Sequence, residues 1–273
     1  MPRPLDQPAQ NGNARLANNG AAQQPEQIGK RGVNRWRGMA LAMVRLSLPA
    51  AQSLAHFLRH PRWTRPMGLG SAESWALWRG ATGLYLAGLL VLALVLHLWQ
   101  RAMGLPSPDA FGKVPPALLL PTVTLLAPVA EECVFRGWLS GRPRALALIA
   151  GLVVAAAALW TVRDGAAHPV ALLLLLLGVL GAALGWFVLR RRETPAWFVA
   201  AFPVLFMLHA VVFALFHLSN YPRITLALVP MVLPQLWAGL VFGFIRVRIS
   251  LPAAMLAHAL GNLAAVTVAF LVQ

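Results

Sequence analysis

The chain has 273 residues, of which 59% are hydrophobic and 11% are charged, and its mean hydropathy is +0.66. This composition excludes an ordinary soluble domain and is typical of an integral membrane protein. The formal net charge of +15 does not indicate a nucleic-acid partner, because the basic residues alternate with apolar segments and form no single patch. The one cysteine, Cys133, excludes an internal disulfide.

Two segments precede the long apolar stretches. Residues 1–38 are rich in Pro, Gln, Asn, Gly and Arg and lack periodic apolar residues, so we predict a disordered cytoplasmic tail. Residues 39–79 are expected at the membrane surface, as an amphipathic helix over 39–58 followed by a basic, Trp-containing connector over 59–79. One helical face of 39–58 carries the polar residues Arg45, Gln52 and His56.

Hydrophobic segments of near-spanning length fill the remaining domain, 80–273. We predict seven spans, at about 80–99, 115–139, 144–162, 169–189, 198–219, 224–245 and 252–272. The predicted fold is therefore all-α, a polytopic transmembrane helical bundle. If 39–58 also crosses the bilayer, the number of spans is eight.

The basic residues predict the orientation of these spans. With the N-terminus in the cytoplasm, the inner segments hold 19 of the 23 basic residues. The outer segments hold only Arg101, Lys113, Arg163 and Arg223. This asymmetry predicts a cytoplasmic N-terminus and an external C-terminus. Arginine outnumbers lysine 21 to 2, which is compatible with a GC-rich bacterial genome and hence with a bacterial inner membrane.

The second predicted span contains Glu131, Glu132 and Arg136 within an otherwise apolar helix. Carboxylates at membrane depth are costly and usually serve a function. Glu132 and Arg136 are four residues apart on one helical face, so we predict an ion pair. Glu131 is turned away from Glu132 by roughly 100° and can present a free carboxylate to a cavity, as a general base requires. The alternative is that these groups only hold helices together.

Two histidine motifs occur in later spans. The fifth span ends with Phe213 and His217, and the seventh carries His258 and Asn262. Because His258 and Asn262 are four residues apart, their side chains share a helical face and can point into one site. A histidine alone can be an interhelical hydrogen-bonding group, but three polar motifs on three helices favour a common site.

These motifs, in this order, resemble those of the CPBP family, the CAAX prenyl protease and bacteriocin-processing (Abi) intramembrane endopeptidases. The resemblance rests on Glu131-Glu132-x-x-x-Arg136, Phe213-x-x-x-His217 and His258-x-x-x-Asn262. It covers roughly residues 118–270. A departure from the family pattern is the additional apolar pair of segments at about 144–189, which we interpret as an inserted helical hairpin that preserves the orientation of the later spans.

The resemblance implies an endopeptidase that acts on a membrane-anchored peptide or a prenylated protein. In it Glu131 would activate water, and His217, His258 and Asn262 would complete the site, supported by Glu132, Arg136 and Phe213. Either Glu131 works without a metal, which we favour because no HExxH motif occurs, or Glu131, His217 and His258 bind Zn²⁺. Rival functions are a proton- or ion-coupled transporter and a non-catalytic binding or immunity protein of the same fold.

Overall fold

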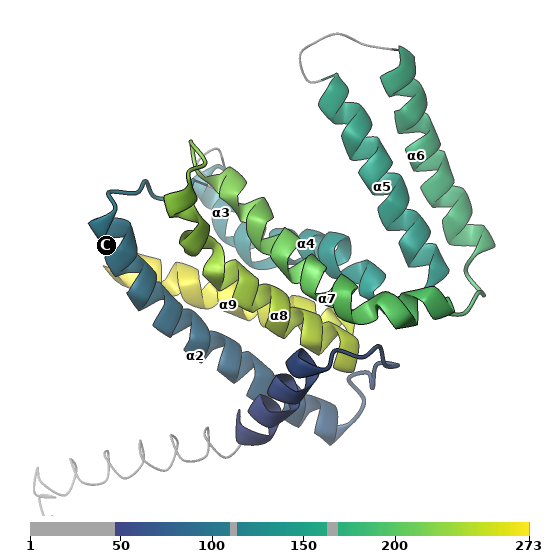
Figure 1. Cartoon of the computed structure of the whole chain (residues 1–273). Helices are drawn as coiled ribbons and strands as arrows, with labels where there is room; N and C mark the ends of the chain where they lie inside the picture. Colours follow the sequence, from purple (N-terminus) through teal and green to yellow (C-terminus); the bar gives the residue numbers. More distant parts are fainter. Residues whose placement is uncertain (1–46, 110–113, 163–168, 273) are drawn as a thin grey trace, which may run out of the picture. The chain divides into compact units, whose positions relative to one another are not determined.

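A computed structural model of the protein describes residues 47–109, 114–162 and 169–272 (Figure 1). All of them belong to the compact unit Met43–Gln273. The regular structure in these ranges is helical and contains no strand, which confirms the predicted all-α class. The predicted tail 1–38 and the start of the predicted amphipathic helix lie outside the described residues.

Seven helical segments of the described residues are long and apolar enough to cross a membrane, which confirms the predicted number. Four of these spans consist of single helices, α2 (Ala72–Ala102), α5 (Pro143–Thr161), α6 (Pro169–Val188) and α9 (Leu251–Val272). The fifth and sixth each include a short 3₁₀ helix, as α7 (Ala196–Phe216) with η3 (His217–Asn220) and η4 (Leu226–Val232) with α8 (Leu233–Arg248). The second span is composite and carries the glutamates.

The first span begins earlier than the hydropathy predicts. α2 starts at Ala72 and not near residue 80, so the C-terminal part of the predicted connector is helical. The Ser71 side chain accepts a hydrogen bond from the Ser74 backbone N–H at 3.1 Å and caps the helix. Glu73 lies in the first turn, where its charge interacts favourably with the helix dipole. The Ser71 cap and the Glu73 charge therefore favour a helix from Ala72, although the segment before residue 80 is polar.

The helix over 47–59 is amphipathic, as predicted for this segment. Its exposed face includes Gln52 and His56. Its buried face includes Ala50, Leu54 and Phe57. The Phe57 ring contacts the rings of Phe206 and Phe244, with centroids 4.8 Å and 5.4 Å away. The helix therefore packs its apolar face on α7 and α8.

α8 is the central helix of the bundle and packs against α2, α7 and α9 (Figure 1). Gly239 allows a close approach to α7, because a Cβ at this position would lie 2.9 Å from the Ala210 Cα. On the side of α2, the Trp237 indole N–H donates to the Tyr85 carbonyl at 3.1 Å. Buried aromatic and aliphatic side chains from α7, α8 and α9 form the core between them, including Phe206, Phe213, Phe242, Ile245 and Ala257.

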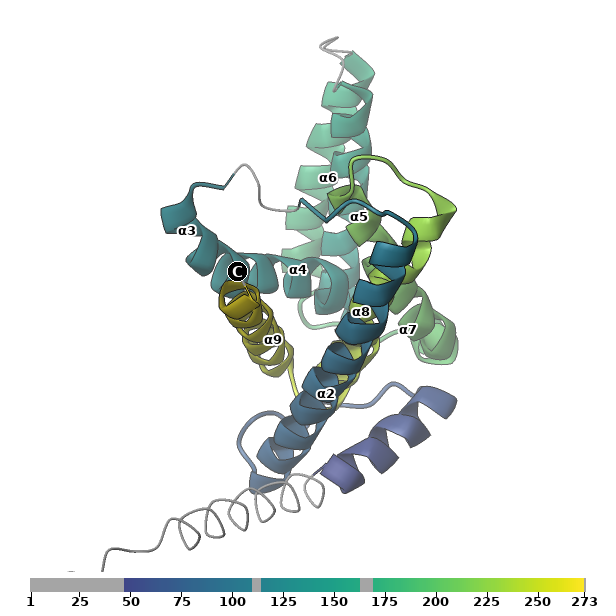
Figure 2. The same ribbon diagram turned by 90° about the vertical axis from the view of Figure 1, so that its left-hand side faces the viewer.

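α5 and α6 lie side by side in both ribbon views, over the range predicted as a hairpin (Figures 1 and 2). Their contact surface consists of small residues. A Cβ on Gly151 would lie 2.4 Å from the Gly178 carbonyl oxygen, and one on Gly178 would lie 2.9 Å from the Ala155 nitrogen. Small residues allow helix backbones to approach closely, which is how helices pack when lipid removes the hydrophobic driving force.

Replacing Gly178 with alanine is expected to destabilise the hairpin, because the new methyl group would press on the backbone of α5. The cost is on the order of 1–3 kcal/mol, as for overpacked interiors. Gly181, on the same helix, faces open space and provides the control, so Gly181→Ala should be neutral or slightly stabilising. Thermal unfolding of both variants in detergent measures the difference. Equal midpoints would contradict the packing described.

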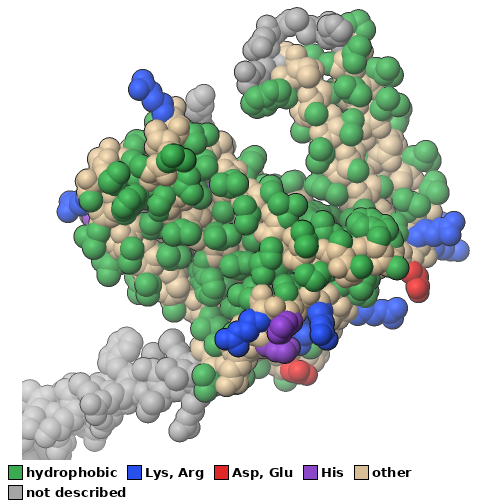
Figure 3. Space-filling model, viewed as in Figure 1, with side chains coloured by type: hydrophobic (Ala, Val, Ile, Leu, Met, Phe, Trp, Pro, Cys, Tyr) green, Lys and Arg blue, Asp and Glu red, His purple; other side chains and the backbone are tan. Residues whose placement is uncertain are grey.

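The surface agrees with a membrane environment. Hydrophobic side chains cover most of the face seen in Figure 3, and most of its charged side chains lie in the lower right of that view. Exposed leucines and valines occur along every spanning segment, for example Leu94, Leu125, Leu172 and Val212. An apolar band of this kind is the surface that lipid chains solvate.

Candidate active site

The second span, which carries both glutamates, is a broken helix and not the continuous one that its hydropathy suggests. α3 (Pro116–Pro121) leads into a π-helical turn, η1 (Thr122–Leu126), then α4 (Ala127–Arg136) and a 3₁₀ turn, η2 (Gly137–Ser140). The Ala127 N–H bonds to the Thr122 carbonyl, in the π pattern. The next nitrogen, that of Pro128, has no hydrogen to donate, so the Val123 carbonyl lacks a partner within its own helix.

Asn262 supplies that partner from α9. Its Nδ2 donates to the Val123 carbonyl oxygen at 2.8 Å. This bond fastens α9 to the helix of the glutamates, one turn from His258. The Asn262 amide nitrogen therefore donates to the backbone of another span. The motif predicted instead that this amide would point into the site together with His258. The sequence pattern places Asn262 on the same helical face as His258. It does not reveal that the Val123 carbonyl on the neighbouring span needs a donor.

Asn262→Ala is expected to destabilise the protein by about 1–3 kcal/mol, since the buried Val123 carbonyl would lose its donor. Thr267→Ala is a matched control on the same helix, because the exposed Thr267 hydroxyl bonds only to the Leu263 carbonyl of its own helix. Denaturation of the two variants in detergent should separate them clearly. If Asn262→Ala unfolds like the control, the interhelical bond contributes nothing to stability.

Glu132 and Arg136 form the predicted ion pair at the end of α4. Both side chains are fully buried, and Arg136 Nη1 donates to Glu132 Oε1. Phe213 and Phe242 contact the guanidinium, with ring centroids 4.1 Å and 5.5 Å from its Cζ atom. A buried charge needs such compensation, because it has lost its hydration.

Arg246 of α8 holds the end of the glutamate helix. Its Nε donates to the Arg136 carbonyl at 3.1 Å, and its Nη2 donates to the Gly137 carbonyl at 3.3 Å. These carbonyls lie at the junction of α4 and η2, where the Gly137 carbonyl also accepts from the Ser140 hydroxyl at 3.2 Å, and a cation is favourable at this end of the helix dipole. Sequence reasoning counted Arg246 only as a topology signal. Its position four residues after Phe242, on the same helical face, was the available clue.

Glu131 lies opposite both histidines. Its Oε2 is 3.9 Å from His217 Nε2 and 3.8 Å from His258 Nε2, so residues from three spans meet at one carboxylate. His217, from the fifth span, is the first residue of the 3₁₀ turn η3 that follows α7. Within the described residues, Glu131 Oε2 has no direct hydrogen-bond partner. The Glu131 side chain is 26% exposed, against 0% for Glu132, as expected for the free carboxylate of the two.

Both imidazoles are oriented by a hydrogen bond at Nδ1. His217 Nδ1 lies 2.8 Å from the Phe213 carbonyl, and His258 Nδ1 lies 2.9 Å from Glu132 Oε1. Since a carbonyl and an ionised carboxylate only accept hydrogen bonds, Nδ1 must carry the proton in each ring. The Nε2 atoms are therefore left to face Glu131. The Phe242 ring stacks on His258, with centroids 5.1 Å apart and planes 28° apart, and holds it in this position.

The distances from Glu131 Oε2 to the two imidazole Nε2 atoms can be compared with those between the ligands of a bound Zn²⁺. A tetrahedral Zn²⁺ with bonds of about 2.0–2.1 Å brings its ligand atoms to roughly 3.4 Å from one another. The measured separations from Glu131 to the imidazoles, 3.8 Å and 3.9 Å, are longer. In the described part of the chain, no group of three His, Cys, Asp or Glu side chains is spaced to hold a metal ion. As placed, Glu131 therefore lies farther from both imidazoles than zinc ligands lie from one another.

The fold and these side chains define a polytopic membrane protein with a buried carboxylate–imidazole site at the meeting point of three spans. Residues 113–202 match the family model of type II CAAX prenyl endopeptidase Rce1-like proteins, which confirms the family recognised from the motifs. This segment contains Glu131, Glu132 and Arg136. At the family level the match indicates a CAAX-type intramembrane protease. Comparisons with curated proteins and with solved structures find no match.

Proposed function

We propose that this protein is an intramembrane endopeptidase in which Glu131 is the general base. The observation that carries the proposal is the position of Glu131 Oε2, within 3.9 Å of two imidazole nitrogens and without a direct hydrogen-bond partner among the described residues. Such separations are too long for direct hydrogen bonds and are of the size that one bridging water spans. A water held there is in contact with the base that would activate it.

The two imidazoles have different partners, which suggests different roles. His258 bonds through Nδ1 to the carboxylate of Glu132, and a carboxylate partner orients the imidazole ring. With a proton on both ring nitrogens, its Nε2–H would donate to the oxyanion that forms on the peptide carbonyl. His217 bonds to a backbone carbonyl through Nδ1, and in the neutral ring its Nε2 would accept a hydrogen bond from the attacking water.

In the proposed reaction, Glu131 carries the transferred proton from the water to the departing amine. Water attacks the peptide carbonyl carbon while Glu131 takes its proton, and His258 stabilises the tetrahedral oxyanion. Collapse of this intermediate breaks the C–N bond, and Glu131 returns the proton to the departing amine. Arg136, Arg246 and Asn262 would act by positioning the helix that bears Glu131, since their contacts are with Glu132 and with backbone carbonyls.

The substrate we propose is a peptide bond near the membrane, in a prenylated or otherwise membrane-anchored protein. This follows from the family match and from the position of the site among spanning helices. A peptide attached to a lipid is already concentrated in the bilayer, which brings its scissile bond to an intramembrane site.

We also propose the orientation with the N-terminus in the cytoplasm, supported by the distribution of basic residues. Reporters fused after Arg192 and after Gln273 should then give cytoplasmic and external signals, respectively. A cytoplasmic signal from the C-terminal fusion would overturn the orientation, because an odd number of spans places the two ends of the domain on opposite sides.

The enzymatic proposal is tested with purified protein in detergent and a panel of quenched peptides that includes a farnesylated C-terminal peptide. We expect cleavage of at least one peptide and the same rate with and without a chelator. Loss of cleavage in chelator, restored by added Zn²⁺, would replace the glutamate mechanism with a metal-dependent one. Absence of cleavage across the panel would count against the peptidase.

A further inference from the structure

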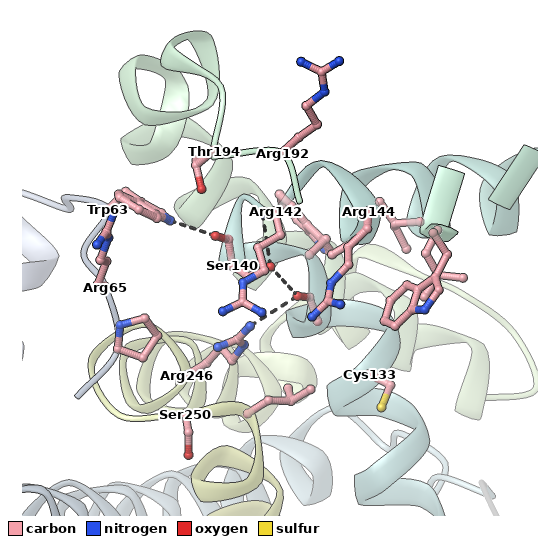
Figure 4. Close-up of a pocket in the computed structure, with 18 of the residues that line it drawn as sticks. Trp63, Arg65, Cys133, Ser140, Arg142, Arg144, Arg192, Thr194, Arg246 and Ser250 are labelled. Carbon is pink, nitrogen blue, oxygen red and sulfur yellow. Dashed lines mark hydrogen bonds between the residues drawn. The ribbon is translucent and has the colours of Figure 1, made fainter. Parts of the chain in front are cut away.

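A large cavity lies at the end of the bundle where the glutamate helix terminates. Its volume is about 950 Å³, and residues of α4, η2, α5, α6, α8 and α9 line it together with adjoining loops (Figure 4). Glu131, His217 and His258 are absent from its lining. The side chains proposed for hydrolysis therefore do not line the cavity, which lies beside the glutamate helix.

Positive charge dominates this cavity. Five arginines line it against a single acidic residue, Glu193, and they are Arg65, Arg142, Arg144, Arg192 and Arg246. Figure 4 shows the guanidinium groups of Arg142 and Arg246 next to each other, while Arg192 extends away. None of the five takes part in an ion pair with an acidic side chain among the described residues. Like charges held together in this way favour an anion between them.

Two helix N-termini add to the positive potential. α5 begins at Pro143, and Arg144 and Ala145 of its first turn line the cavity. α9 begins at Leu251, which also lines it, together with Ser250. The positive end of a helix dipole favours phosphate and other anions.

Part of the cavity lining is apolar and belongs to the hairpin. Leu148, Ile149 and Leu152 of α5 and Trp186 of α6 form it. An apolar groove of about 300 Å³ continues along the hairpin and shares Leu148, Leu152 and Trp186 with the cavity. Arg144 lies over the Trp186 ring, with its Cζ atom 4.8 Å from the ring centroid, at the border between the basic and apolar parts. A ligand that fits both parts has an anionic head and a hydrocarbon chain.

We propose that this cavity binds an anionic phospholipid, with its phosphate at Arg142, Arg144 and Arg246 and an acyl chain in the hairpin groove. Basic pockets between transmembrane helices near the membrane surface are suited to such headgroups. The groove distinguishes a lipid from free phosphate, which would use only the basic part. The bound lipid joins the hairpin to the rest of the bundle, because its head contacts α8 and its chain contacts α5 and α6.

The test is a titration of the full-length protein in detergent with fluorescent phosphatidylglycerol, and with phosphatidylcholine carrying the same label. We expect tighter binding of phosphatidylglycerol, and a loss of about thirtyfold in its affinity in the double variant Arg142→Gln/Arg144→Gln, from two removed charges. The matched control is Arg190→Gln/Arg191→Gln, which removes the same charge from exposed residues outside the cavity. Equal losses in the two double variants would overturn the site, since they would reflect general surface charge.

A substitution in the hairpin groove tests whether an acyl chain binds there. Leu152→Trp fills the groove and should weaken phosphatidylglycerol binding, whereas Leu173→Trp, on an exposed position of α6 outside the groove, should not. Complete competition by inorganic phosphate at concentrations comparable to the lipid, with Leu152→Trp unchanged, would show an anion site without a lipid chain and refute the proposal. Thermal unfolding confirms that each variant is folded before it is titrated.

Discussion

Glu131→Gln is expected to reduce peptide hydrolysis by a factor on the order of 10² to 10⁴, the usual contribution of a general base. The amide has the same size as the carboxylate but cannot take a proton from water. Stability should change little, because Glu131 Oε2 has no direct hydrogen bond to lose among the described residues. The measurement is the initial rate on whichever peptide the wild-type protein cleaves, together with the thermal midpoint of each protein.

Glu73→Gln is the matched control for this variant. Glu73 is an exposed acid in the first turn of α2, so its replacement removes the same charge away from the site. It should keep the wild-type rate. A Glu131→Gln protein that is folded and cleaves within a few-fold of wild type would remove Glu131 from the mechanism and would leave the histidines without the base proposed for them.

Glu132→Gln should instead act mainly on stability, with a loss of about 3–5 kcal/mol, because it leaves the fully buried Arg136 guanidinium without its counter-charge. The same change replaces the carboxylate that orients His258, so the rate should fall as well. Unfolding in detergent gives the first effect, and the initial rate of the remaining folded protein gives the second.

A double variant separates the ion pair from other contacts of Glu132. Glu132→Gln/Arg136→Met removes both charges, and methionine is suited to the apolar space between Phe213 and Phe242. We expect it to be more stable than Glu132→Gln alone, since a missing pair costs less than an unpaired buried charge. If the two replacements are additive, the buried pair is not the source of the stability difference.

The spacing of apolar segments was sufficient to predict the spans, because lipid imposes a minimum length on each. The Glu132–Arg136 contact was also predictable, since residues four apart on a helix are neighbours whatever surrounds them. Both inferences use rules that are local in the chain.

Features that depend on contacts between helices were harder to predict. The partner of Asn262 arises from a π-helical turn on another span, and hydropathy does not distinguish that turn from a regular helix. Arg246 looked like one more charge at a membrane surface until α8 was placed beside the end of α4. The approach of Glu131 to His217 is a contact between the second and fifth spans, at the 3₁₀ turn that follows α7. The roles of these residues in hydrolysis stay proposals.

The way the glutamate helix is held determines when the site can exist during synthesis. The carbonyl of Val123 before this helix accepts a hydrogen bond from Asn262, and the carbonyls of Arg136 and Gly137 at its end accept from Arg246, so both donors belong to the last two spans. His258, which faces Glu131, lies on the final span as well. A nascent chain emerging from the ribosome therefore carries its glutamates into the bilayer long before their partners arrive. The catalytic arrangement cannot form until the final helix has inserted.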